Sequence, residues 1–496
     1  MNMRNEGGVT VTNRSAHFIG IGGIGMSALT RWFLAQKWRV SGSDLAKSKI
    51  TRELAKEGVK LKIRQKKARL GRQLGLVIYS QAIKSSNSEL RMARRLRLAS
   101  LSYPEAVGRL TEKYKTVAIA GAHGKSTTTA LTALILKKAG FDPTVIVGTN
   151  LKEFGGKNFL SGKGPYLVLE ADEFGRAFLH YSPALAVVTN IDKEHLDTYK
   201  NLTAVKNAFL KFLLRVKPGG ALILNQDDKN LFSLKLRIKK IAKSKNLKVV
   251  WYSVLRNNRT TNIIQQLLYN RSKFATSPAH FSFGRRTAER IRKIIRIPGE
   301  HNVSNAAAAY AVGRVLKIPE NRILGAISKY RGSWRRMEYR GLLKAKSSKL
   351  KARVYDDYAH HPTEIKATLA AFREKFPKSK IVCVFQPHQA KRLQALFREF
   401  VTAFNDADIT VLIPFYKVAG RDRMDSRFTS QTLAAAIQKK YPAKQVFYLA
   451  NPRKLKQFIT KILRRSAYSP RQSALVVMMG AGDIVNYTDT LVRNSA

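Results

Sequence analysis

The amino-acid sequence predicts an α/β protein made of three successive α/β units. Apolar runs of strand length alternate with helical stretches, which is typical of parallel sheets. Glycine-rich turns join a strand to a helix in two places. The length of 496 residues suits three domains of roughly 150 residues each. We therefore expect domains at residues 1–112, 113–330 and 331–496.

The first unit begins with a strand near Ser15, passes through a glycine turn and continues as a helix to about Gln36. Two further strands are predicted at Trp38–Asp44 and Gly75–Ser80. In the second unit we expect strands at Lys115–Ala120, Tyr166–Leu169 and Ala184–Thr189, and a helix at Thr127–Gly140. In the third we expect strands at Ala352–Asp356, Lys380–Phe385, Ile409–Ile413 and Leu475–Met479, and a helix from about Pro362 to Phe376. The basic stretch 257–277 fits a loop, an edge strand or an insertion.

The first glycine turn carries the pattern G-x-G-x-x-G at Gly20, Gly22 and Gly25. Glycine permits a tight turn and lets a diphosphate approach the N–H groups at a helix N-terminus. Asp44 lies 19 residues after Gly25, at the end of the second strand, where an acid commonly meets ribose. Alone, the pattern suits a nicotinamide dehydrogenase or another nucleotide-diphosphate binder. The alternative is a turn that needs glycine only for close packing of helix on sheet.

The second glycine turn, Gly121-Ala-His-Gly-Lys-Ser126, resembles a phosphate-binding loop. Its N–H groups would hold phosphates, Lys125 would reach the β- and γ-phosphates, and the Ser126 hydroxyl would bind Mg²⁺. Ile119 stands at the first glycine of the usual motif, so the loop is a shortened variant. It predicts the use of ATP and argues against a simple dehydrogenase.

Acidic residues are scarce, 32 against 91 Lys and Arg, so the places where they gather are informative. One group follows the apolar strand at 166–169 and another follows the strand at 184–189: Glu170, Asp172 and Glu173, then Asp192, Glu194, His195 and Asp197. Both strand ends would lie at the carboxyl edge of the sheet, beside the phosphate loop. There they suit one or two divalent cations. The alternative is a set of helix caps and surface acids.

Further polar segments follow. Asn302 and Asn305 stand three residues apart at the start of an alanine-rich helix, where they would cap the helix or bind a base edge. Seven of the nine histidines fall inside the polar segments: His17, His123, His195, His301, His360, His361 and His388. This clustering predicts that the segments converge on one site.

The formal net charge is +59. Basic side chains bind nucleic-acid phosphates, but here they recur along the whole chain, and we expect solvated surfaces rather than a nucleic-acid partner. A single cysteine, Cys383, excludes an internal disulfide framework and a zinc cluster. No run approaches the ~20 apolar residues of a membrane helix, and the first residues do not form a signal peptide. A cytoplasmic protein without a membrane partner is expected.

In chain order, the segments GIGGIGMS, GAHGKSTTT, EADEF, TNIDKEHLDTY, PGEHNVSNA, RRMEY, DDYAHHPTE, FQPH and GAGD resemble those of the Mur ligases of peptidoglycan synthesis. The resemblance extends from about His17 to Asp483. It implies a Rossmann-like N-terminal domain for a UDP-sugar, a central P-loop ATPase domain and a Rossmann-like C-terminal domain for an amino acid. It also implies ATP and Mg²⁺ as cofactors. We expect a monomer or a homodimer.

Carried onto this sequence, the resemblance assigns roles to four groups of residues. The UDP-sugar would contact Gly22, Gly23, Gly25, Met26, Ser27, Asp44, Ser80 and Ala82. ATP would contact Gly121, Ala122, His123, Gly124, Lys125, Ser126, Thr127, Asn302, Asn305, Arg336 and Asp357. The metal would be bound by Ser126, Glu170 and His195. The amino acid or the sugar carboxylate would contact Tyr358, His360, His388 and Arg392. Catalysis would depend on Lys125, Glu170, His195, Arg336 and His361, the last as a candidate acceptor for the amine proton.

Two positions refine the resemblance. Leu210 stands 15 residues after His195, where other Mur ligases carry a carbamylated lysine. This fits the alanine-adding branch, whose substrates are UDP-N-acetylmuramate and L-alanine. Gln389 follows His388 where that branch usually has an arginine, so Arg392 alone remains of the expected pair.

The implied reaction is ATP-dependent amide formation. The lactyl carboxylate attacks the γ-phosphate to give an acyl phosphate, and the amine then displaces phosphate. Three alternatives remain: a murein tripeptide recycling ligase of the same family, a basic nucleic-acid-binding ATPase, and an inactive scaffold of the same fold.

Overall fold

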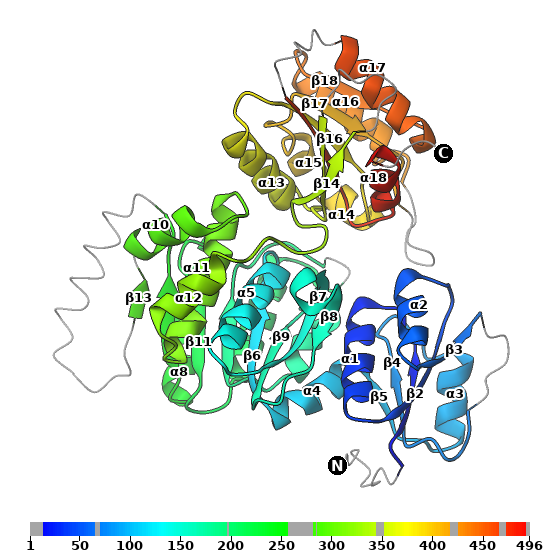
Figure 1. Cartoon of the computed structure of the whole chain (residues 1–496), viewed down its shortest axis with the longest axis vertical. Helices are drawn as coiled ribbons and strands as arrows, with labels where there is room; N and C mark the ends of the chain where they lie inside the picture. The colour runs from blue at the N-terminus through cyan, green and yellow to red at the C-terminus, as the bar shows by residue number, and fades with distance from the viewer. Residues whose placement is uncertain are drawn as a thin grey trace. The chain divides into compact units, whose positions relative to one another are not determined.

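The structure is a computed structural model that describes residues 13–64, 70–195, 198–255, 281–283, 285–343, 352–416, 425–465 and 473–492 (Figure 1). The stretch 257–277 lies outside these ranges. Two compact units are distinguished. The first comprises residues 1–194, 198–294 and 304–329, and the second comprises residues 195–197, 295–303 and 330–496. The domain boundaries near residues 113 and 331 stay a prediction.

The first unit contains a five-stranded parallel sheet in the order β3-β2-β1-β4-β5. Its strands are β1 (Ser15–Ile19), β2 (Arg39–Asp44), β3 (Lys60–Ile63), β4 (Leu76–Tyr79) and β5 (Ser100–Ser102). The accompanying helices are α1 (Ile24–Ala35), α2 (Lys49–Lys56), α3 (Ser88–Arg95) and α4 (Tyr103–Lys113). The strand order reverses between β1 and β4, which is where open α/β sheets bind ligands. The glycine turn after β1 lies at this point.

The same unit contains an eight-stranded sheet in the order β13-β12-β11-β10-β6-β9-β7-β8, in which only β8 runs antiparallel to its neighbour. Its strands are β6 (Lys115–Ala120), β7 (Thr144–Leu151), β8 (Lys157–Leu160), β9 (Tyr166–Glu170), β10 (Leu185–Val188), β11 (Ala221–Asn225), β12 (Lys248–Tyr252) and β13 (Phe281–Phe283). The helices are α5 (Lys125–Lys138), α6 (Leu202–Leu214), α7 (Lys229–Phe232), α8 (Lys235–Ser244), α10 (Arg285–Ile294), α11 (Glu300–Val315) and α12 (Glu320–Ile327). Helix α11 contributes its residues from 304 onward to this unit.

The second unit is built on a six-stranded sheet in the order β14-β15-β19-β16-β17-β18, with β14 antiparallel and the rest parallel. Its strands are β14 (Glu338–Leu342), β15 (Ala352–Asp357), β16 (Lys380–Phe385), β17 (Ile409–Leu412), β18 (Gln445–Tyr448) and β19 (Ala474–Met479). Its helices are α13 (Pro362–Lys375), α14 (Ala390–Ala395), α15 (Phe397–Val401), α16 (Ser430–Lys440), α17 (Leu455–Arg465) and α18 (Ile484–Val492).

The central strands of each sheet are buried on both faces, which explains why their sequences read as continuous apolar runs rather than alternating ones. All six residues of β19 are buried, and so are all four of β10. The strands predicted at Lys115–Ala120 and Lys380–Phe385 coincide with β6 and β16. The helix predicted from Thr127 begins two residues earlier, at Lys125, directly after the loop glycine. Among the described residues, no helix is long and apolar enough to cross a membrane.

Candidate active site

The glycine-rich loop that is expected to bind phosphates joins β6 to α5, so the predicted order of strand, turn and helix is confirmed. Gly121 and Gly124 have φ angles of 138° and 82°, a region that favours glycine. A side chain at Gly124 would also collide with Asn305 of α11. Helix α5 therefore begins at Lys125. Its first-turn N–H groups have no carbonyl partner within the helix and attract an anion, as the helix dipole also does.

The side chain of Lys125 folds back over this loop. Its Nζ donates to the Gly121 carbonyl at 2.8 Å and to Glu173 Oε2 at 2.9 Å, and Asp172 Oδ1 lies 3.6 Å away. Burial by itself would lower the pKa of Lys125, but the two carboxylates outweigh it and raise the pKa. Lys125 is therefore cationic at neutral pH and lies beside the loop that would receive phosphates.

Glu170 ends β9 next to the loop. Its Oε1 accepts a hydrogen bond from Ser126 Oγ at 3.1 Å, and its Oε2 accepts one from the Gly148 N–H at 2.7 Å. Burial raises the pKa of Glu170, while Lys125 acts in the opposite direction. A hydroxyl and a carboxylate are oxygen ligands of the kind Mg²⁺ prefers, and a cation would stabilise the charged form of a buried carboxylate. The pair Ser126 and Glu170 therefore fits a magnesium ion.

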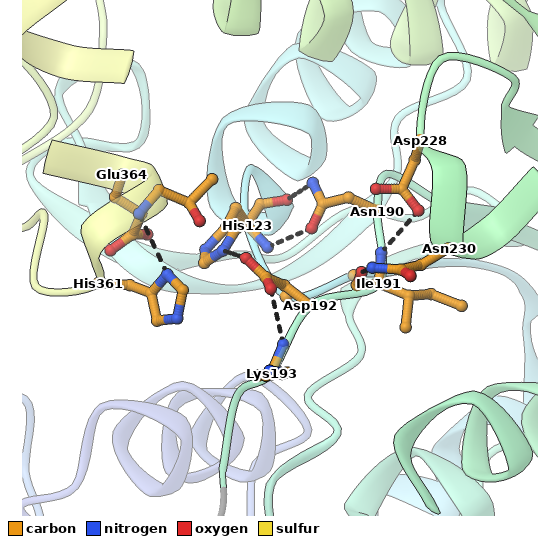
Figure 2. Close-up of polar contacts among 12 residues, drawn as sticks. His123, Asn190, Ile191, Asp192, Lys193, Asp228, Asn230, His361 and Glu364 are labelled. Atoms are coloured by element: carbon orange, nitrogen blue, oxygen red, sulfur yellow. Dashed lines mark hydrogen bonds and ion pairs between the residues drawn. The ribbon is translucent and has the colours of Figure 1, made fainter. Parts of the chain in front are cut away.

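His123 of the loop is held by the polar segment that follows β10 (Figure 2). Its N–H donates to Asn190 Oδ1 at 2.8 Å, and its Nε2 lies 3.0 Å from Asp192 Oδ2. Its carbonyl accepts hydrogen bonds from Thr189 Oγ1 and Asn190 Nδ2 at 2.6 and 2.9 Å. The two acidic segments flank the loop because β6 lies between β9 and β10 in the sheet. Sequence reasoning did not single out Thr189 or Asn190, although both stand in the quoted motif.

In the glycine turn after β1, one glycine is required by packing and another has free space around it. A Cβ on Gly25 would lie 2.7 Å from the Tyr103 hydroxyl oxygen, so this glycine is required by packing. A Cβ on Gly23 would meet nothing closer than 3.7 Å, and Gly23 is exposed. Its lack of a side chain is not explained by packing and suits a diphosphate that approaches the backbone. Asp44 Oδ2 accepts from the Gly22 N–H at 2.7 Å and so fixes the turn.

The remaining residues expected at the UDP-sugar have different surroundings. Met26 and Ser27 are buried, and the Ser27 hydroxyl donates to the Ile24 carbonyl at 2.8 Å. Ser80 Oγ accepts from the Ala82 N–H at 3.3 Å, in the loop after β4. That loop and the glycine turn meet, since the Ser80 N–H donates to the last carbonyl of β1, on Ile19.

A buried polar network under the glycine turn was missed by sequence reasoning. His17 Nε2 lies 3.3 Å from Glu89 Oε1, and Ser43 Oγ donates to Glu89 Oε2. Burial would raise the pKa of Glu89, but the hydrogen bonds from His17 and Ser43 prevail and lower it. The Ser43 carbonyl accepts from the N–H groups of Gly20 and Ile21, so the network supports the turn. The available signal was one acid in an otherwise basic helix, α3.

In the second unit, two neighbouring arginines have different surroundings. Arg335 is buried and binds Asp356 Oδ1 at 2.8 Å and the Gly480 carbonyl. Arg336 is partly exposed, lies 5.4 Å from the Tyr358 ring centre and lies 3.4 Å from Glu364 Oε1. Arg336 is therefore the more accessible of the two, and its contact with the γ-phosphate stays a prediction.

Asp357 ends β15 and is buried. Its carboxylate accepts hydrogen bonds from the N–H groups of Met337 and Ala359 at 2.7 and 2.8 Å. Burial raises its pKa to about 6, with Arg336 and the two N–H groups opposing the shift. This carboxyl is expected to bind the ATP ribose.

The residues expected at the amino acid form a ring cluster in the same unit. The Tyr358 and His360 rings are 5.3 Å apart, and those of His360 and His388 are 6.3 Å apart. His388 also stacks on Tyr416 at 5.6 Å, a contact that the sequence did not predict. Arg392 is buried on α14, and Gln389, with φ of 65°, stands just before that helix. The cluster thus contains His360, His388, Tyr358 and Tyr416.

His361 caps α13, because its Nδ1 accepts from the Thr363 N–H at 3.3 Å. In the neutral ring this contact leaves the proton on Nε2, so the geometry favours a donor at that nitrogen. The role of His361 as an acceptor of the amine proton stays a prediction.

The two asparagines of α11 also differ. Asn302 Nδ2 donates to the Pro298 carbonyl at 2.7 Å, whereas Asn305 lies against Gly124 of the phosphate loop. The first unit contains Lys125, Ser126, Thr127, Glu170 and Asn305; the second contains His195, Asn302, Arg336, Asp357 and His361. That the two sets form one site stays a prediction.

Comparison with protein families matches nearly the whole chain to three domain models. The Mur ligase family catalytic domain matches residues 15–115, the Mur ligase middle domain matches residues 119–313, and the Mur ligase glutamate ligase domain matches residues 335–482.

Curated relatives agree with these matches. A UDP-N-acetylmuramate–L-alanine ligase of Pelobacter propionicus is 37% identical over 478 residues, covering 96% of this chain and 97% of the relative. An enzyme of the same name from Clostridium kluyveri is 35% identical over 413 residues, covering 83% and 86%. Among solved structures, a UDP-N-acetylmuramate-alanine ligase from Thermotoga maritima shares the fold, with a TM-score of 0.70, 24% identity and coverage of 96% and 98%. The expected three-domain α/β fold is confirmed.

Proposed function

Because the chain belongs to the Mur ligase family, we propose that it is an ATP-dependent ligase that joins L-alanine to UDP-N-acetylmuramate. The product is a precursor of peptidoglycan. Two curated relatives with that name, 35–37% identical over most of the chain, support this specific activity. The structural observation that best supports this activity is the glycine-rich loop with Lys125 and Glu170 beside it. These residues supply the cationic and acidic groups that phosphoryl transfer requires.

Each unit would contribute part of the chemistry. The glycine turn at Gly22 and Gly23 would hold the diphosphate of the UDP-sugar. The loop from Gly121 to Ser126 would hold the phosphates of ATP. In the second unit, Arg336 and Asp357 would bind ATP. Four further residues would bind the amino acid or the sugar carboxylate: Tyr358, His360, His388 and Arg392.

The reaction brings two anions together, since the lactyl carboxylate attacks the γ-phosphate. Lys125 would offset this repulsion and stabilise the charge on the transferring group. The acyl phosphate would then react with the amine of L-alanine, and phosphate would leave. The intermediate reacts with water, so the mechanism is expected to include a domain closure that excludes water.

Mg²⁺ would be held by Ser126 and Glu170, together with His195. When bound, it would supply positive charge to the phosphate oxygens of ATP. Independently of the ion, Ser126 and the Gly148 N–H orient the two oxygens of Glu170. We further propose that the enzyme acts in the cytoplasm, as a monomer or a homodimer, on these two small-molecule substrates.

A phosphate-release assay with ATP, UDP-N-acetylmuramate and single amino acids tests the proposal. We expect release that depends on both the UDP-sugar and L-alanine. Absence of L-alanine-dependent release would contradict it. Preference for a tripeptide of L-alanine, D-glutamate and diaminopimelate would instead identify a recycling ligase. DNA binding that competes with the UDP-sugar would favour a nucleic-acid-binding ATPase.

A further inference from the structure

Asn158, on β8, lies where the strand packs against α1. Its side chain is fully buried and is engaged at both ends. The Nδ2 group donates to the Ile24 carbonyl at 2.6 Å and to Ser27 Oγ at 3.2 Å. Oδ1 accepts from the Arg31 guanidinium at 2.6 Å. A single amide thus contacts three residues of the helix that follows the glycine turn.

Arg31 is itself a buried cation. Besides Asn158, it binds Glu57 Oε2 at 2.9 Å and lies 3.4 Å from Glu53 Oε2, both on or next to α2. A buried charge is tolerated only where it is paired and hydrogen-bonded. The guanidinium therefore fixes the Asn158 carboxamide in one orientation, with oxygen toward Arg31 and nitrogen toward Ile24.

Asn158 contacts the first turn of α1, the part of the helix that is expected to bind the diphosphate. Ile24 is the first residue of the helix and directly follows Gly23, the exposed glycine whose missing side chain packing does not explain. The first turn of a helix supplies the N–H groups that bind an anion. The orientation of that helical turn relative to the glycine turn therefore decides whether these N–H groups point at the diphosphate. Asn158 therefore fixes the first turn of α1 from β8, a strand of the eight-stranded sheet, whereas α1 follows β1 of the five-stranded sheet.

We propose that Asn158 is a positioning residue for the UDP-sugar: its amide holds the first turn of α1 in the orientation that receives the diphosphate. The inference rests on the proposed function for the identity of the ligand. Asn158 touches no reacting atom and acts only through Ile24 and Ser27. Asparagine suits the position because its amide offers an acceptor and a donor at once. The oxygen accepts from Arg31, 127 residues away, and the nitrogen donates to the Ile24 carbonyl, 134 residues away.

Asn158→Asp is the most selective test. An aspartate of nearly the same size keeps an acceptor for Arg31, but it cannot donate to the Ile24 carbonyl and places an anionic oxygen against it. We expect the KM for UDP-N-acetylmuramate to rise about tenfold, the size expected for one lost buried hydrogen bond. The KM for ATP should stay within about twofold. A merely structural defect would reduce the folded fraction and hence the apparent kcat, but it would leave both KM values unchanged.

Lys157→Ala is the matched control. Lys157 precedes Asn158 on the same strand, and its ammonium group pairs with Glu57 Oε1 at 3.1 Å rather than with the first turn of α1. We expect both KM values of this variant to match the wild type. As a second variant, Asn158→Ser retains one donor in a shorter side chain and should fall between the wild type and Asn158→Asp.

Calorimetric titration of each protein with UDP-N-acetylmuramate, without ATP, separates this inference from the proposed function. Equal affinity of the wild type and Asn158→Asp, or a parallel rise of both KM values, would overturn the positioning role. If the wild type binds the UDP-sugar without turnover, the proposed reaction fails, and the ratio of the dissociation constants still decides the role of Asn158. If the wild type does not bind the UDP-sugar, both proposals fail.

Discussion

The Ser126 hydroxyl donates to Glu170 Oε1 at 3.1 Å, which joins the helix after the phosphate loop to the end of the neighbouring strand β9. Ser126 follows Lys125 directly, so a cation and a candidate metal ligand stand on the same helical turn. Glu170 is held on its other side by the Gly148 N–H. The acid is thus oriented by both a side chain and the backbone.

Replacing Ser126 should expose its role as a metal ligand. We expect Ser126→Ala to lower kcat by about tenfold or more and to raise the Mg²⁺ concentration needed for half-maximal activity. Ser126→Thr, which keeps the hydroxyl, should stay near the wild type. Thr132→Val is a matched control, because Thr132 is a buried hydroxyl residue farther along α5. An unchanged Mg²⁺ dependence of Ser126→Ala would contradict the assignment.

Lys125 is expected to contribute both to the stability of the fold and to turnover, and a double variant separates the two contributions. Lys125→Met leaves the buried Glu173 carboxylate, 1% exposed, without its cation, and should destabilise the fold by about 3–5 kcal/mol. The double variant Lys125→Met/Glu173→Gln should recover much of that stability, measured by thermal unfolding. Phosphate release should remain at least about 10³-fold below the wild type in both variants. UDP-sugar binding by the double variant should be retained; restored turnover would remove Lys125 from catalysis.

The adjacent arginines of the second unit should respond oppositely to substitution. Arg336→Ala should lower kcat by about 10²-fold or more with little change in the melting temperature. Arg335→Ala leaves the fully buried Asp356 carboxylate without its cation, with only the hydrogen bond from Thr488 Oγ1 at 2.9 Å, and should cost about 3–5 kcal/mol of stability. Thermal unfolding and phosphate release measured on both variants check this. A stable Arg335→Ala with a large catalytic loss would reverse the two roles.

Asp357 predicts a pH dependence of stability. Its pKa is raised by burial from 3.8 to about 6, so the native state binds the proton more tightly than the unfolded chain does. The resulting stabilisation is fully present below the unfolded pKa and is lost as the pH rises through about 6. The change is about 3 kcal/mol, from two pKa units of ~1.4 kcal/mol each.

Asp357→Asn removes this titration. The stability advantage of the wild type over the variant should therefore shrink between pH 4 and 7 in denaturant unfolding. An advantage that stays constant or grows with pH would contradict the raised pKa.

The sequence was most informative where one physical requirement dominates. The loop from Gly121 to Ser126 could be placed because glycine, lysine and a hydroxyl occur at fixed spacing between a strand and a helix. The buried strands could be placed because β6 and β16 are continuous apolar runs. Helix α5 begins at Lys125 rather than Thr127 because the φ of Gly124 ends the loop there.

Contacts between residues far apart in the chain could not be predicted. Glu89 pairs with His17 across 72 positions, and neither the strand nor the helix pattern indicates that pairing. The difference between Arg335 and Arg336 depends on which side chain turns toward Asp356. Gln389 illustrates the same limit: the structure places it before α14 with φ of 65°, and no contact explains its replacement of the usual arginine.

The contact between Ile24 and Asn158 joins two segments that are far apart in the chain. Its two residues are separated by 134 positions, so α1 is synthesised long before the strand that completes its hydrogen bonds. Closing so long a loop costs chain entropy before the contact can stabilise the fold. Until β8 emerges, Arg31 must be hydrated or paired with α2 alone. The buried Arg31 thus depends for one of its hydrogen bonds on a strand that is synthesised well after the helix that carries it.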